Sequence, residues 1–220
     1  GQGWGMTETS PICVVGRLLP KHAGLPVGEQ QKVKLKQGRG VFGVELKIVD
    51  EEGHRLPWDG KAFGEVWVRG PWIASGYFKG EGGERLDGEG FFPTGDIATI
   101  DADGYLQLVD RTKDVIKSGG EWVSSIDLEN AAMGHPDVAE AAVIAVPHPK
   151  WQERPLLLVV AREGRSPSRE DILEHLAGQV AKWWLPDDVV FLDELPHTAT
   201  GKVLKLELRK QFQDHRLPTV

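Results

Sequence analysis

Apolar and polar residues alternate along short stretches in the first half of the chain. Within residues 41–49 every second residue from Val44 to Ile48 is apolar, and the stretch ends in an acidic turn with a glycine. Residues 64–69 repeat the alternation. A period of two is that of a strand with one buried face, so both stretches predict β-strands. Short strands at hairpin spacing predict a small antiparallel β-barrel.

The pattern changes in the second half, where apolar runs alternate with amphipathic segments. Residues 138–146 and 156–160 are apolar enough for buried strands. Ser124 and Ser168 each precede an aspartate by three residues, an arrangement of capping-box form that begins a helix. These elements predict a compact α+β module. The dense glycines of residues 1–5, by contrast, predict a loop.

Charges gather between the two patterns. The stretch 110–121 is rich in Asp, Arg and Lys and then carries two adjacent glycines. Such a composition suits a junction better than a core, and taken alone it indicates an exposed hairpin with solvated charges. We therefore expect an α+β protein of two domains, a β-rich one over residues 1–110 and an α+β one over residues 111–220.

Composition narrows the classes of partner. The 220 residues carry a formal charge of -7, and 40% of them are hydrophobic. A surface that binds nucleic acid broadly must be basic, so nucleic acid is excluded as an electrostatic partner. The single cysteine, Cys13, excludes an internal disulfide and agrees with a cytoplasmic location. No apolar run approaches the roughly 20 residues of a membrane-spanning helix. No pattern sets the oligomeric state, and a homodimer is left open.

Five motifs follow one another along the chain. They are Trp4-Gly5-Met6-Thr7-Glu8-Thr9, residues 64–70, Thr94-Gly95-Asp96, residues 110–121 and Thr200-Gly201-Lys202. In this order they resemble the later half of the adenylate-forming (AMP-binding) superfamily of acyl-CoA synthetases, luciferases and peptide-synthetase adenylation domains. The Ser-Gly-Gly-Glu-Trp-Val-Ser segment is most similar to the medium/long-chain fatty acyl-CoA synthetase branch. The resemblance covers nearly the whole chain, and ordered motifs are far more specific than any one alone.

The resemblance implies a nucleotide site near the start of the chain. In the family an aromatic residue at the position of Trp4 lies against adenine, whereas by itself Trp4 is equally well a core aromatic. The glycines around Gly5 allow the backbone to approach a flat ligand closely. Thr7 belongs to the same motif. A carboxylate beside a nucleotide suits Mg2+, a cation that prefers oxygen ligands, and the resemblance gives Glu8 this bridging role.

Two later residues complete this nucleotide site. The Asp96 carboxylate can accept two hydrogen bonds at once, which suits the paired hydroxyls of a ribose. An aspartate in a glycine turn at a strand end is by itself more often an Asx turn, and the family's Thr-Gly-Asp motif is what assigns it to the ribose. Arg111 offers a rigid fork of donors for ribose or phosphate oxygens.

The remaining motifs imply a second domain that moves. Lys113 occupies the family's hinge position, where backbone torsions change between two half-reactions. Gly119 and Gly120 allow close approach of a pantetheine chain. Trp122 lines that channel or packs against the next helix. Lys202, which alone would be an ordinary surface lysine, matches the family's catalytic lysine, whose ammonium offsets the charge of the carboxylate and α-phosphate as they react.

The resemblance implies an acyl-CoA synthetase that uses ATP, Mg2+, coenzyme A and a small carboxylic acid. The acid attacks the α-phosphate of ATP to give acyl-AMP and pyrophosphate, and the thiol of coenzyme A then displaces AMP. The sequence begins at Gly1 inside a glycine-rich motif without an initiator methionine. A fragment is therefore expected, with the family's phosphate loop and most of its acyl pocket upstream, and the chain alone is expected to be inactive.

Three other functions stay open at this point. One is an aryl or short-chain acyl-CoA ligase with the same machinery. Another is a peptide-synthetase adenylation domain. The third is a non-catalytic remnant that acts as a binding or interaction domain. His148, a lone loop histidine, is expected to be solvated rather than catalytic.

Overall fold

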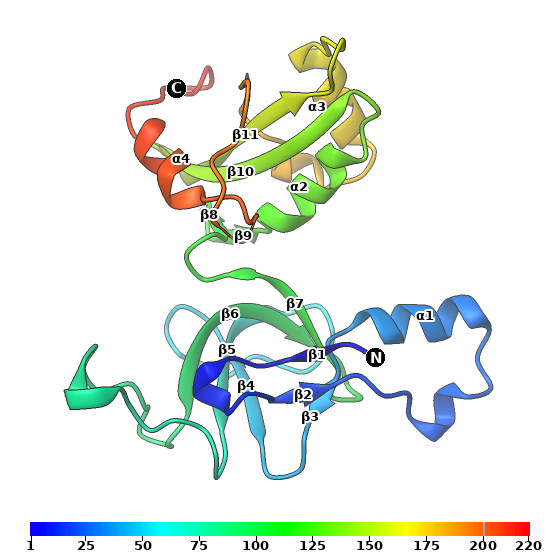
Figure 1. The fold of residues 1–220 in the computed structure, drawn as a ribbon, viewed down its shortest axis with the longest axis vertical. Coiled ribbons are helices and arrows are strands. Elements are labelled where there is room, and N and C mark those ends of the chain that lie inside the picture. Colours follow the sequence, from blue (N-terminus) through cyan, green and yellow to red (C-terminus); the bar gives the residue numbers. More distant parts are fainter. Residues whose placement is uncertain (200) are drawn as a thin grey trace. The chain divides into compact units, whose positions relative to one another are not determined.

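The computed structural model describes residues 1–199 and 201–220, and in it the chain forms two compact units (Figure 1). The N-terminal unit is Gly1–Thr112 and the C-terminal unit is Lys113–Val220. Their boundary falls just beyond the division placed on the sequence. Both units combine antiparallel strands with helices, which confirms the α+β class.

A four-stranded antiparallel sheet forms most of the N-terminal unit. Its strands follow chain order: β4 (Glu45–Val49), β5 (Phe63–Arg69), β6 (Phe92–Ile100) and β7 (Leu106–Arg111). Along β5, buried and half-buried residues alternate strictly, as its period of two predicts. Among the described residues β4 and β7 are not paired with each other, so the expected barrel is not closed. Four strands of ordinary twist leave the sheet open.

A small second sheet corrects the loop predicted for residues 1–5. Its three strands are β1 (Gly3–Trp4), β2 (Val14–Val15) and β3 (Arg39–Gly40), with β2 in the middle. Glycine lowers the local preference for a strand, but pairing with β2 outweighs it. Helix α1 (Val27–Leu35) follows β2 and buries none of its residues.

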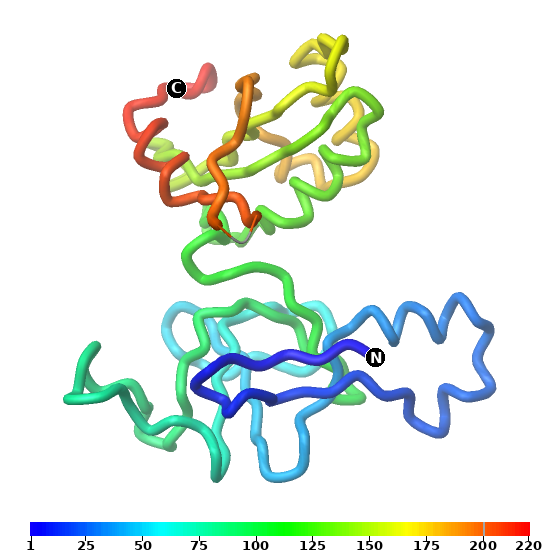
Figure 2. Tube along the Cα trace, in the orientation of Figure 1, coloured from blue at the N-terminus to red at the C-terminus, as the bar shows by residue number. Residues whose placement is uncertain are grey.

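The C-terminal unit is built on a five-stranded sheet. Its strands are β8 (Ile116–Ser118), β9 (Glu121–Val123), β10 (Val138–His148), β11 (Gln152–Ala161) and β12 (Asp188–Phe191). The long hairpin of β10 and β11 can be followed in the trace of Figure 2. Both strands run further than their apolar runs, because pairing continues to His148 and Gln152. Strand β12 lies parallel to β11.

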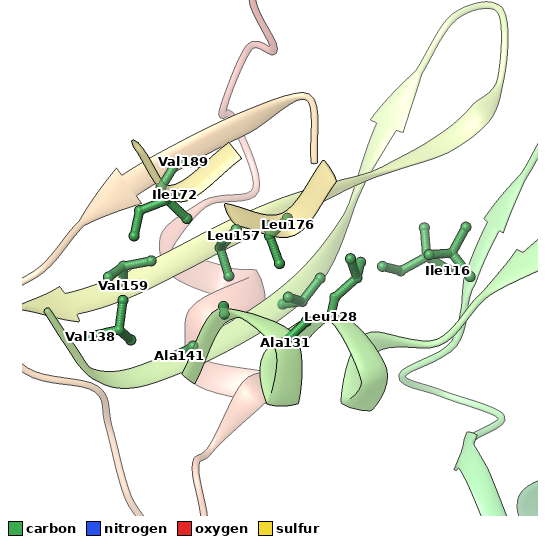
Figure 3. Close-up of a cluster of buried hydrophobic side chains, with 13 residues drawn as sticks. Ile116, Leu128, Ala131, Val138, Ala141, Leu157, Val159, Ile172, Leu176 and Val189 are labelled. Carbon is green, nitrogen blue, oxygen red and sulfur yellow. The ribbon is translucent and has the colours of Figure 1, made fainter. Parts of the chain in front are cut away.

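Helices cover both faces of this sheet. The side chains of Ser124 and Ser168 accept hydrogen bonds from backbone N–H groups three residues on, so both predicted caps are confirmed. The helices that they begin, α2 (Ser125–Met133) and α3 (Arg169–Ala177), contribute Leu128 and Leu176 to the core shown in Figure 3. Helix α4 (Lys205–Gln211) packs Leu208 into a second cluster.

Short 3-10 helices complete the described chain. They are η1 (Thr7–Thr9), η2 (Pro20–His22), η3 (Phe78–Gly80) and η4 (Lys182–Trp184). Across the described residues, no helix has the length and apolar character needed to cross a membrane.

Candidate functional site

Asp96 lies in a bulge of strand β6, not in a turn at a strand end. The pairing of β6 with β5 skips here, so residues 94–96 stand opposite the single residue Val66. The Thr94 hydroxyl donates to the Val66 carbonyl oxygen at 2.7 Å and accepts from the Asp96 backbone N–H at 3.2 Å. The threonine side chain thus replaces ladder bonds that the bulge breaks. It fixes the backbone that carries Asp96.

Two other predicted nucleotide residues flank the Asp96 carboxylate. The indole N–H of Trp4, 92 positions away in the sequence, donates to Oδ2 at 2.8 Å. Nε of Arg111, the residue paired with Asp96 on β7, lies 3.7 Å from Oδ1. The Asp96 side chain is 19% exposed and that of Arg111 is 57% exposed. Three strands therefore bring together three of the predicted residues around one carboxylate that solvent still reaches.

The ring of Trp4 packs in the core of the N-terminal unit. It is 8% exposed and belongs to the hydrophobic cluster that holds Cys13, Val14 and Leu46. The core-aromatic alternative therefore describes the surroundings of most of the ring. Contact with an adenine base stays a prediction for the small part that remains exposed.

Glu8 lies in η1 and is held by a residue that the sequence did not single out. The Tyr77 hydroxyl donates to Glu8 Oε1 at 2.6 Å. The backbone N–H of Ala74 donates to the Glu8 carbonyl oxygen at 2.8 Å. The hydrogen bond to Glu8 raises the pKa of Tyr77 above its ordinary value. Mg2+ is usually bound through one or two carboxylates plus phosphates and waters, and the half-buried Glu8 carboxylate fits such a role.

The loop around η1 accounts for the glycine before it. A Cβ atom at Gly5 would lie 1.9 Å from the Pro11 carbonyl oxygen, so the protein's own backbone excludes a side chain there. The buried Thr9 hydroxyl accepts from the Met6 N–H at 2.8 Å, which closes the loop on itself. Thr7 is exposed at its tip. Gly5 thus permits the tight loop that presents Thr7 and Glu8, and its close approach to a nucleotide stays a prediction.

Lys113 is the first residue of the C-terminal unit. It lies in the turn that joins β7 to β8. Few residues are needed to absorb a rotation at such a point. A hinge motion about Lys113 stays a prediction.

Gly119 and Gly120 form the turn of the β8–β9 hairpin. Their φ angles are 63° and 86°, and positive φ at both central residues is typical of the type I′ turn of two-residue hairpins. The Gly119 N–H donates to the Trp151 carbonyl oxygen at 2.8 Å, and a Cβ atom at Gly119 would lie 2.9 Å from the Trp151 ring. Trp122 follows on β9, half-buried and paired with Lys117.

A pocket of about 630 Å³ opens beside this hairpin. It is lined by Ser118, Gly119, Glu121, His148, Lys150, Trp151, Arg154, Trp183, Asp187 and Thr219. Arg154 is the rigid cation of its wall, because its guanidinium donates to Asp187 Oδ1 at 2.5 Å and to the Trp183 carbonyl oxygen at 2.8 Å. The pocket thus combines aromatic rings, cations and an open backbone turn, a lining typical of small-molecule sites.

His148 differs from the solvated loop histidine that was expected. It ends strand β10 and is 8% exposed. Its Nδ1 accepts from the backbone N–H groups of Lys150 and Trp151 at 3.1 Å and 3.2 Å. These bonds place the ring proton on Nε2 when the ring is neutral. The histidine therefore holds the short loop that carries Trp151.

Lys202 stands on a tight hairpin between β12 and α4. The Thr198 N–H donates to the Lys202 carbonyl oxygen at 2.8 Å, and the Lys202 N–H donates to the Thr198 hydroxyl at 3.2 Å. His197 and Val203 pair on either side of it. Thr200, which belongs to the predicted motif, lies outside the described residues. The backbone is thus fixed on both sides of an exposed lysine.

Cys13 offers no nucleophile. Its side chain is fully buried, and burial raises the pKa of the thiol to about 11 against the weaker opposite effect of a hydrogen bond with Thr9. The reactive form of cysteine is the thiolate, which is therefore scarce at neutral pH.

Comparison with known proteins agrees with these motifs. A family model described as "AMP-binding enzyme" matches residues 1–78, and one described as "AMP-binding enzyme C-terminal domain" matches residues 127–202. Over 96% of its length the chain is 55% identical to a 3-methylmercaptopropionyl-CoA ligase of Ruegeria lacuscaerulensis. Over 97% it is 53% identical to a long-chain-fatty-acid–CoA ligase of Thermus thermophilus.

The chain is also similar to solved structures of this kind of enzyme. ATP-bound MatB from Rhodopseudomonas palustris matches 96% of the chain with a TM-score of 0.79 at 32% identity. The chain spans 39% and 40% of the length of the two curated relatives and 40% of the MatB chain.

Proposed function

The chain belongs to the adenylate-forming (AMP-binding) superfamily, and on this premise we propose that the complete protein is an ATP-dependent acyl-CoA ligase for a fatty or related carboxylic acid. The observation that carries the proposal is the Asp96 carboxylate, which a bulge and an indole N–H hold at the surface of the N-terminal unit, with the Arg111 guanidinium nearby. A fixed, partly exposed carboxylate is suited to binding a vicinal diol. The relatives, which are acyl-CoA ligases by name, support the proposed ligase reaction.

We propose that the N-terminal unit binds the nucleotide. Asp96 accepts hydrogen bonds from the ribose hydroxyls, and Arg111 donates to ribose or phosphate oxygens. Thr7 and the backbone at Gly5 line the same side of the site. Glu8 would hold Mg2+, which when bound offsets the negative charge of the phosphates. Tyr77 keeps one carboxylate oxygen of Glu8 engaged.

In the first half-reaction, repulsion between negative charges opposes the approach of the acid to ATP. A carboxylate oxygen of the acid bonds to the α-phosphorus of ATP, and the bond from that phosphorus to pyrophosphate breaks. An anion must therefore approach a polyanion, and the Lys202 ammonium stabilises the negative charge of both reactants. The hairpin around Lys202 fixes the backbone from which this ammonium extends.

The second half-reaction needs room for a thiol. The thiol of coenzyme A loses its proton to solvent, its sulfur bonds to the acyl carbon, the bond from that carbon to oxygen breaks, and AMP leaves. The Gly119-Gly120 turn presents only backbone to a passing pantetheine chain, with Trp122 beside it. The adjoining pocket supplies Lys150 for an anionic group, whereas the Arg154 guanidinium is already paired with Asp187. Rotation about Lys113 would exchange the Lys202 loop for this hairpin between the two steps.

A second substrate class also has support, because the relative with 55% identity is named for a short thioether acid. A panel of acids assayed with ATP and coenzyme A separates the classes. It should contain medium- and long-chain fatty acids, 3-methylmercaptopropionate and an aryl acid. We expect AMP, pyrophosphate and a CoA thioester, with the largest kcat/KM for a fatty acid.

Other outcomes of the panel would contradict the proposal. A higher kcat/KM for the thioether or aryl acid would assign the short-chain or aryl class. Adenylation of an amino acid without thioester formation would indicate a peptide-synthetase domain. A folded complete protein that turns over no acid of the panel would favour the non-catalytic remnant.

A further inference from the structure

The Asp96 carboxylate is oriented by one buried donor. The Trp4 indole N–H reaches Oδ2 at 2.8 Å, whereas Arg111 Nε stays 3.7 Å from Oδ1, beyond hydrogen-bond distance. Trp4 is 8% exposed and packed in a hydrophobic cluster, whereas the Arg111 side chain is 57% exposed. A long, exposed arginine has many rotamers, so the fixed partner of the carboxylate is Trp4.

We propose that Trp4 is a positioning residue for Asp96, and that through its indole N–H it determines the preference of the site for nucleotides with an intact ribose diol. The inference rests on the proposed function, because it assumes that Asp96 receives the ribose. It assigns the main effect of Trp4 to the hydrogen bond and not to stacking on the base.

Free rotation of the carboxylate is the reason why a positioning residue is needed. The χ2 torsion of aspartate is broad and roughly two-fold, so a fixed backbone does not fix the carboxylate plane. Thr94 fixes the backbone at Asp96. Within residues 1–199 and 201–220, the bond from Trp4 is the one side-chain hydrogen bond to this carboxylate, so it sets the plane. A diol that binds both oxygens depends on that plane.

The chemistry of indole suits this task. An indole N–H donates and cannot accept, so it cannot take the hydrogen bonds that the ribose hydroxyls donate to the carboxylate. An ionised carboxylate offers about four lone-pair positions, of which Trp4 takes one on Oδ2. Oδ1 and the second position on Oδ2 remain for the two hydroxyls.

The burial of the ring argues against stacking as the main effect. A base that stacks on an aromatic ring needs an exposed face of that ring, and Trp4 keeps 8% of its surface exposed. The hydrogen bond to Asp96, by contrast, needs no exposed face of the ring.

The test compares two nucleotides in the complete protein by calorimetry. AMP carries the diol, and 2′,3′-dideoxy-AMP lacks it but keeps the base and phosphate. Trp4→Phe should weaken AMP binding about tenfold, because it removes a hydrogen bond to a charged group. Binding of dideoxy-AMP should stay unchanged. Adding Trp4→Phe to Asp96→Ala should cause no further loss of AMP affinity, since the two residues act as one unit.

Trp67→Phe is the matched control. The Trp67 indole N–H donates to Glu65 Oε2 at 3.1 Å within β5, so this variant also removes an indole–carboxylate bond from the same unit. It should leave the preference for AMP as in the parent protein. If Trp4→Phe does not fold, replacement of Trp4 by benzothienylalanine keeps the ring shape and removes the N–H, and the same loss is expected.

Two results would overturn the inference, and a third separates it from its premise. Equal weakening of both nucleotides by Trp4→Phe would assign Trp4 to stacking. An unchanged preference for AMP in Trp4→Phe would remove its positioning role. A parent protein that binds AMP and dideoxy-AMP equally, or neither, would refute the ribose role of Asp96 itself and with it the inference.

Discussion

Replacing Lys202 with alanine in the complete protein is expected to slow formation of acyl-AMP by about 10²–10³-fold, the usual cost of losing one group that stabilises developing charge. Conversion of preformed acyl-AMP to the CoA thioester should stay within about threefold of the parent rate, because rotation about Lys113 would already have exchanged the Lys202 loop for the Gly119-Gly120 hairpin in that step. Single-turnover assays of the two half-reactions measure both rates separately.

The structure supplies a control for this variant. Lys182 is another exposed lysine of the C-terminal unit and lies in η4, away from the Lys202 hairpin in sequence. Lys182→Ala removes the same charge and should leave both half-reactions unchanged. Equal losses in both half-reactions for Lys202→Ala would instead indicate a general structural defect.

Replacing Lys113 with proline is expected to slow thioester formation by at least about tenfold while acyl-AMP formation changes little. Proline fixes φ near -65° and also restricts Thr112 before it, so the first residue of the C-terminal unit loses the freedom that a hinge requires. Burst kinetics with ATP and acid, followed by addition of coenzyme A, separates the steps.

Glu163→Pro is the control for the introduction of a proline into an exposed turn of the C-terminal unit. Glu163 is exposed in a turn that the Arg165 N–H closes on the Arg162 carbonyl oxygen, and proline is favoured at the second position of such turns. This variant should behave as the parent. An unaltered rate of thioester formation in Lys113→Pro would contradict the hinge.

Local sequence rules predicted most of the secondary structure. The caps at Ser124 and Ser168 and the alternation along β5 each depend on residues a few positions apart, and all three are confirmed. The errors have a common cause. Strand β1 and the bulge at Asp96 exist because of pairing with distant segments, and single-segment patterns carry no information about such partners.

In the candidate site, too, the sequence predicted residues but not the contacts between distant segments. The motifs predicted Trp4, Glu8 and Asp96 as site residues. They did not predict the hydrogen bonds that these side chains make. The Trp4–Asp96 bond spans 92 positions and the Tyr77–Glu8 bond spans 69. No periodicity connects residues so far apart, and an aromatic residue in a glycine-rich segment does not reveal that its N–H meets a carboxylate. Only the folded chain brings these pairs together.

The route of one oxygen atom shows whether the acid attacks the α-phosphorus of ATP. The complete protein is supplied with ATP, coenzyme A and an acid whose carboxylate is labelled with 18O, and the products are analysed by mass spectrometry. Label is expected in AMP and none in pyrophosphate, because a carboxylate oxygen bonds to the α-phosphorus and stays there when the thiol takes the acyl group. Unlabelled AMP, or ADP together with labelled orthophosphate, would contradict it.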